Sequence, residues 1–160
     1  MSSFPSKINI AEVVEYLDTV SLDSKIFIGC DSERHRKEGT WFADYHTVVV
    51  VHIDGKHGCK IFGAVDREVD YDVKKSRPKL RLMNEVYRVS GLYLELSQYI
   101  PHEIECHLDI NPDEMHGSSC VITQAIGYIK GTCGVDPQVK PNAWCSSFAA
   151  DRLKHILASA

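Results

Sequence analysis

The chain has 160 residues, with 18 Lys and Arg, 22 Asp and Glu, 8 His and a formal net charge of −4. Its length suits one domain with a hydrophobic core, and its 44% hydrophobic and 25% charged residues argue against disorder, collagen-like repeats or a disulfide miniprotein. It contains no apolar run of the roughly 18–20 residues that span a bilayer and no apolar signal segment at its start, and its acidic balance argues against coating nucleic acid by bulk charge.

The first half of the chain predicts one helix and three strands. Apolar residues at helical spacing predict a helix over residues 9–20. A short apolar run over residues 25–30 predicts a buried strand that ends at Asp31, and the charged residues 32–39 are expected to form a solvated loop. Residues 41–53 and 59–65 predict two further strands, joined as a hairpin by the turn signal Asp54-Gly55.

The second half predicts alternating helices and strands. A well-kept apolar stripe predicts a helix over residues 79–99, which Pro101 follows. Residues 104–110 alternate like a strand, residues 118–130 predict a helix that stops at Gly131, residues 139–141 a short strand and residues 143–158 a last helix. The order indicates an α/β fold, with a five-stranded mixed sheet (three antiparallel strands, then β-α-β-α), helices on both faces and an extra N-terminal helix.

Four acids occupy positions that such a fold would bring together. Asp31 and Asp109 follow strands that, as parallel neighbours, end side by side where open α/β sheets place ligands. Glu85 borders the apolar face of the long helix, although Glu95 occupies a similar face, and Asp151 borders a face of the last helix.

Clustered carboxylates repel one another unless cations are present, and Mg²⁺ or Mn²⁺ resolves that conflict because these ions prefer oxygen ligands. Two such ions, about 4 Å apart, bind the attacking water and the leaving oxygen of a phosphodiester. Ser32 lies beside the predicted centre, and a basic run before the long helix could steer a phosphate backbone toward it. The run contains Lys74, Lys75, Arg77 and Lys79.

Three stretches of sequence resemble the ribonuclease H-like superfamily and, more narrowly, the YkuK-type family of predicted ribonuclease H-like nucleases. They are Ile28-Gly29-Cys30-Asp31-Ser32, His107-Leu108-Asp109-Ile110-Asn111 and Ala149-Ala150-Asp151-Arg152-Leu153. The resemblance extends over residues 25–155. It implies a single ribonuclease H-like domain over residues 1–160 (core 25–158), with Asp31, Glu85, Asp109 and Asp151 as the metal-binding catalytic acids. The histidine that often precedes the last helix in ribonuclease H proper is not found over residues 139–146.

We therefore expect a cytoplasmic nuclease that uses two Mg²⁺ or Mn²⁺ ions to hydrolyse RNA, an RNA–DNA hybrid or structured DNA, without a membrane partner. The alternative is a catalytically silent module of the same fold that binds nucleic acid or a protein. A zinc-dependent hydrolase is disfavoured, because the six cysteines form no C-x-x-C pair and the histidines no H-E-x-x-H motif. We expect reduced cysteines that act as small core residues. The sequence does not indicate an oligomeric state.

Overall fold

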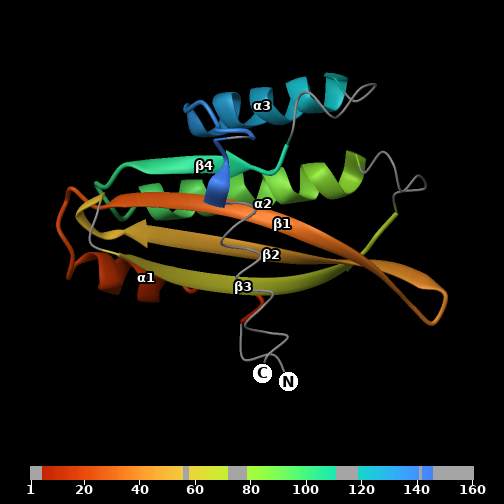
Figure 1. The fold of residues 1–160 in the computed structure, drawn as a ribbon, viewed down its shortest axis with the longest axis horizontal. Helices are drawn as coiled ribbons and strands as arrows, with labels where there is room; N and C mark the ends of the chain where they lie inside the picture. Colours follow the sequence, from red (N-terminus) through yellow and green to blue (C-terminus); the bar gives the residue numbers. More distant parts are fainter. Residues whose placement is uncertain (1–4, 56–57, 72–78, 111–118, 141, 146–160) are drawn as a thin grey trace.

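A computed structural model describes residues 5–55, 58–71, 79–110, 119–140 and 142–145. These residues form an α/β fold with a mixed four-stranded sheet, in the order β3-β2-β1-β4, and three α-helices (Figure 1). The elements are α1 (Ile10–Leu17), β1 (Lys25–Lys37), β2 (Thr40–His52), the 3-10 turn η1 (Ile53–Gly55), β3 (Cys59–Val69), α2 (Lys79–Ser97), β4 (Ile104–Leu108) and α3 (Ser119–Cys133).

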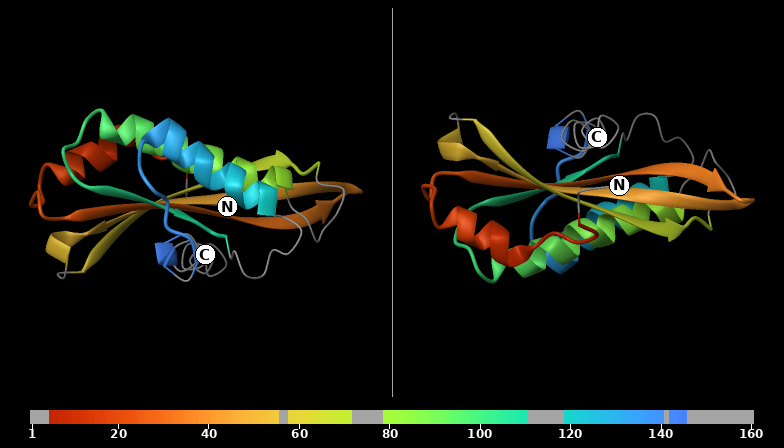
Figure 2. Two further views of the ribbon diagram at one scale, coloured as in Figure 1. Left: turned by 90° about the horizontal axis from the view of Figure 1, so that it is seen from above. Right: turned by 90° about the horizontal axis from the view of Figure 1, so that it is seen from below.

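The sheet is antiparallel on one side and parallel on the other. β1 and β2 form an antiparallel pair, as do β2 and β3, whereas β4 runs parallel to β1. Figure 2 shows α1, α2 and α3 on one face of this sheet. Between the parallel strands the chain runs through α2, which lies across β1 and β4, as a β-α-β connection requires.

The main core lies between the sheet and these helices. β1 turns Ile26, Ile28 and Cys30 toward the helices, because alternate residues of a strand share a face. From α2, the apolar stripe that the spacing predicted supplies Val86 and Val89, both fully buried. The described free cysteines include Cys30, Cys106 and Cys145, which are buried as predicted.

The prediction of a solvated loop over residues 32–39 is wrong. β1 continues through these residues to Lys37, paired with β2, and the hairpin turns at Glu38 and Gly39, whose φ angles are +52° and +81°. Charged side chains are accommodated because they pair across the strands. Arg34 forms an ion pair with Asp70 at 2.6 Å and lies 4.3 Å from the centre of the Trp41 ring.

The end of α3 also differs from the prediction. The helix passes through Gly131 to Cys133, and Gly134 follows it with a φ of +72°. The N–H of Gly134 donates to the carbonyl of Lys130 at 3.0 Å. Glycine is common at this left-handed position because it has no Cβ, so the stop signal was the next glycine along the chain.

Beyond α3 the chain runs beside β4 without a further strand in the described residues. Gln138 forms a single parallel bridge with His107, where a strand over residues 139–141 was expected. The chain then reaches the opposite face of the sheet, where Cys145 packs with Phe27 and Val50 (Figure 2). The three helices described in full cover one face (Figure 2). The predicted last helix lies mostly outside the described residues, so a helix on the other face stays a prediction.

Across the described ranges, no helix combines the length and the apolar character needed to cross a membrane.

Candidate metal centre

The parallel pairing of β1 and β4 places two acids side by side. The last paired residues of these strands are Cys30 and Leu108, so Asp31 and Asp109 occupy the next position on each chain. Beyond this point β1 continues to pair with β2, whereas its pairing with β4 stops because β4 ends at Leu108. Asp31 therefore lies inside a long strand and not at its end. It borders the edge of the sheet where the pairing of β1 with β4 has stopped.

A third acid reaches this edge from α2. Glu85 is 7% exposed, and its carboxylate, together with those of Asp31 and Asp109, offers ligand atoms that all lie within 4.8 Å of one another. The helical stripe explains this position, since Glu85 lies three residues after the buried Leu82 and four before the fully buried Val89. We call Asp31, Glu85 and Asp109 the acidic triad.

The surroundings of Glu85 disfavour its charge. Ser32 donates its hydroxyl to Oε2 at 2.6 Å, while Oε1 is buried and has no hydrogen-bond partner among the described residues. Burial, and then the nearby charges of Asp31 and Asp109, raise the pKa of Glu85 well above its ordinary value of 4.5, against smaller lowering effects from Ser32 and Arg81. A divalent cation would offset the repulsion among the three carboxylates and would bind the unpartnered oxygen of Glu85.

Lys140 meets the triad from the chain segment beside β4. Its Nζ lies 2.9 Å from Oδ1 of Asp109. The backbone N–H of Lys140 donates to the carbonyl of Ile110 at 2.9 Å, and this bond holds the residue next to the end of β4. No role for Lys140 was predicted from the sequence. A signal existed, because the predicted strand over residues 139–141 would place a lysine beside Asp109.

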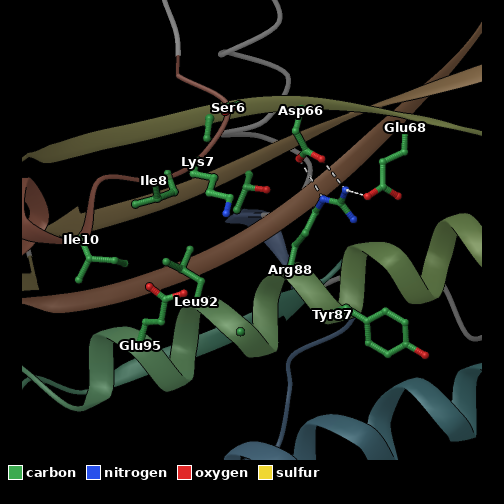
Figure 3. Close-up of a pocket in the computed structure, with 13 residues that line it drawn as sticks. Ser6, Lys7, Ile8, Ile10, Asp66, Glu68, Tyr87, Arg88, Leu92 and Glu95 are labelled. Carbon is green, nitrogen blue, oxygen red and sulfur yellow. Dashed lines mark hydrogen bonds and ion pairs between the residues drawn. The ribbon is translucent and has the colours of Figure 1, made fainter.

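Arg88 fixes α2 on the sheet one turn beyond Glu85. Its guanidinium donates to Asp66 and forms an ion pair with Glu68, both on β3, as Figure 3 shows. It also lies 3.7 Å from the centre of the Tyr45 ring of β2 and donates to the carbonyl of Asn84 at 3.0 Å. These contacts determine the position of the helix turn that carries Glu85.

The structure separates the two candidate glutamates of α2. Glu85 lies in the triad, whereas Glu95 is exposed and lines a separate cavity of about 500 Å³ between α2, β3 and the N-terminal segment (Figure 3). Ser32 donates its hydroxyl to Glu85, and its contact with substrate stays a prediction. Asp151, Lys74, Lys75 and Arg77 lie outside the described residues, and Lys79 begins α2 with its side chain outside the description.

The triad offers oxygen atoms only, the donors that Mg²⁺ and Mn²⁺ prefer. Within the described part of the chain, this is the group that could hold a metal ion, and it contains neither histidine nor cysteine. Zinc sites built by proteins usually include those ligands, so the donor set fits a hard divalent cation better than zinc.

Comparison with protein families finds a match over most of the chain. A family described as ribonuclease H-like matches residues 9–155, which include every member of the triad. No curated protein and no solved structure matches the chain.

Proposed function

The chain belongs to the ribonuclease H-like family, and from this premise we propose that it is a divalent-metal-dependent nuclease. The observation that carries the proposal is the acidic triad. Its three carboxylates offer ligand atoms within 4.8 Å of one another at one edge of the sheet, and a buried oxygen of Glu85 has no hydrogen-bond partner among the described residues. Such a group is unfavourable alone and becomes favourable around Mg²⁺ or Mn²⁺.

In this proposal Asp31, Glu85 and Asp109 hold the metal, with Asp151 as a fourth acid. Two bound ions would activate a water and neutralise the charge that develops on the leaving oxygen of a phosphodiester. Ser32 holds the carboxylate of Glu85 in place, and Arg88 holds the helix turn that carries it. Residues 1–160 act as one domain of the YkuK type, in the cytoplasm.

The proposed substrates are RNA, an RNA–DNA hybrid or structured DNA. The family premise supports a nucleic acid in general, and the metal supplies positive charge at the reacting centre of a chain whose net charge is −4. Lys74, Lys75, Arg77 and Lys79 are proposed to contact the phosphate backbone before α2.

The test is a digest of end-labelled RNA, hybrid and branched DNA by the purified chain, with Mg²⁺ or Mn²⁺ and with a chelator. We expect metal-dependent cleavage that falls at least about 100-fold in Asp109→Asn, because metal assistance contributes several kcal/mol to the transition state. The matched control is Asp136→Asn, an 80% exposed acid paired with Lys130, which should cleave like the wild type. Equal cleavage by Asp109→Asn and the wild type would show that the centre is wrongly assigned. Tight binding without cleavage would identify a silent binding module.

A further inference from the structure

Lys140 is a cation that the fold itself places on the acidic triad. We propose that its ammonium is a built-in counter-ion, which pairs with Asp109 and competes with a divalent cation for this carboxylate. The inference rests on the proposed metal centre and deepens it, because it makes metal uptake an exchange of one cation for another.

The first support is the contact itself. Nζ of Lys140 lies 2.9 Å from Oδ1 of Asp109, whose side chain is 18% exposed. That oxygen belongs to the carboxylate that contributes to the triad. A divalent cation and an ammonium ion repel each other strongly at such short range, so binding of a metal ion to this carboxylate favours the departure of Lys140.

The second support is how Lys140 is held. Its backbone is fixed, because its N–H donates to the carbonyl of Ile110 at 2.9 Å. Two residues earlier, Gln138 donates its N–H to the carbonyl of Cys106 and accepts the N–H of Leu108, both on β4. Its side chain is 41% exposed and has a flexible four-carbon stem. Movement of the ammonium away from Asp109 therefore requires rotation of this side chain and no change in the sheet.

The third support is the balance of charge. Each acid of the triad has a contact within the protein: Ser32 donates its backbone N–H to Asp31 at 2.9 Å and its hydroxyl to Glu85 at 2.6 Å, and Lys140 pairs with Asp109. The contact from Lys140 brings a full positive charge to Asp109. Lys140 therefore offsets part of the repulsion within the triad, and its positive charge also opposes the binding of a metal ion there.

The test measures Mn²⁺ binding to the chelator-treated full chain by titration calorimetry, with the free ion followed by electron paramagnetic resonance. We expect Lys140→Met, which keeps most of the length of the side chain and removes its charge, to bind Mn²⁺ about 10-fold more tightly than the wild type. Lys140→Gln should show the same direction, and Lys140→Arg should stay within about 2-fold of the wild type.

The matched control is Lys130→Met. Lys130 pairs with the exposed Asp136 at 3.2 Å, away from the triad, so this variant removes the same charge from the protein without touching the centre. Its Mn²⁺ affinity should equal that of the wild type.

The outcomes separate this inference from the metal centre on which it rests. If the wild type binds Mn²⁺ and neither Lys140→Met nor Lys140→Gln binds it more tightly, Lys140 is no counter-ion, while the metal centre stands. An equal gain in Lys130→Met would overturn the inference by assigning the effect to net charge. If neither the wild type nor any Lys140 variant binds Mn²⁺, the metal centre and the counter-ion are both refuted.

Discussion

Glu85 and Glu95 belong to the same helix and differ in what surrounds them. Glu85 is 7% exposed, lies against two other acids and has a raised pKa, because burial and the charges of Asp31 and Asp109 disfavour its ionised form. Glu95 is exposed. A carboxyl whose pKa is raised in the folded state keeps its proton to higher pH than in the unfolded chain. Folding is therefore favoured below the ordinary value of 4.5 and loses stability as the pH rises from there toward the raised pKa.

This difference predicts the effect of Glu85→Gln on stability. In the presence of a chelator at pH 7–8, we expect this variant to be about 1–3 kcal/mol more stable than the wild type, because an amide avoids the cost of a buried charge and still accepts the hydrogen bond of Ser32. Near pH 4 the gain should vanish. Urea denaturation across this pH range measures both values.

The control for that measurement is Glu95→Gln, which makes the same change on the exposed surface of α2 and should alter stability by less than about 0.5 kcal/mol. A wild-type-like stability of Glu85→Gln at pH 8 would contradict a buried, disfavoured carboxylate.

At the scale of elements, the long hairpin of β1 and β2 depends on two turn residues in the left-handed region. Gly39 has a φ of +81°, and a Cβ added to it would have open space around it, with no heavy atom within 4 Å. A substitution there therefore probes the backbone conformation alone. Gly127, inside α3, also has open space around it and no positive φ.

Gly39→Ala and Gly127→Ala should consequently change stability in opposite directions. We expect Gly39→Ala to destabilise the fold by about 1 kcal/mol, since an L-residue is strained at positive φ. Gly127→Ala should stabilise it by up to about 1 kcal/mol, since alanine favours a helix interior. Thermal and urea unfolding of both variants give the comparison. Stabilisation by Gly39→Ala would rule out the positive-φ turn.

At the scale of the whole molecule, the triad joins three segments that are distant in sequence: β1, α2 and the end of β4. The unfolded chain cannot hold these carboxylates together, so a cation that binds the triad binds the native state alone. Such a ligand stabilises the fold by mass action, by about 2.7 kcal/mol at 100 times its dissociation constant.

Mn²⁺ should accordingly raise the melting temperature of the wild type. For a domain of this size the expected increase is roughly 5–10 °C at saturating Mn²⁺. Asp31→Asn should lose most of the increase, and Asp136→Asn, which changes an exposed acid, should keep it. Differential scanning fluorimetry over a Mn²⁺ series provides the measurement. An equal increase in all three proteins would mean that the ion binds elsewhere.

Local pattern was enough to locate most elements and the candidate acids. Apolar spacing predicted α1, α2 and α3 within a few residues, because burial on one face of a helix imposes its period on the sequence. The pairing of Asp31 with Asp109 followed from the rule that parallel strands end together. The family resemblance supported the same acids, and the family match extends over them.

The tertiary structure decided what depends on partners distant in the chain. Residues 32–37 look like a loop in sequence because they are charged, and they form a strand because β2 satisfies their backbone and Asp70 and Trp41 pair with Arg34. The choice between Glu85 and Glu95 needed the position of α2 on the sheet, which Arg88 determines through β2 and β3. The ion pair of Lys140 needed the return of the chain beside β4. Burial and charge at a site are sums over neighbours from many segments, so the sequence by itself named the acids and only the fold showed what surrounds them.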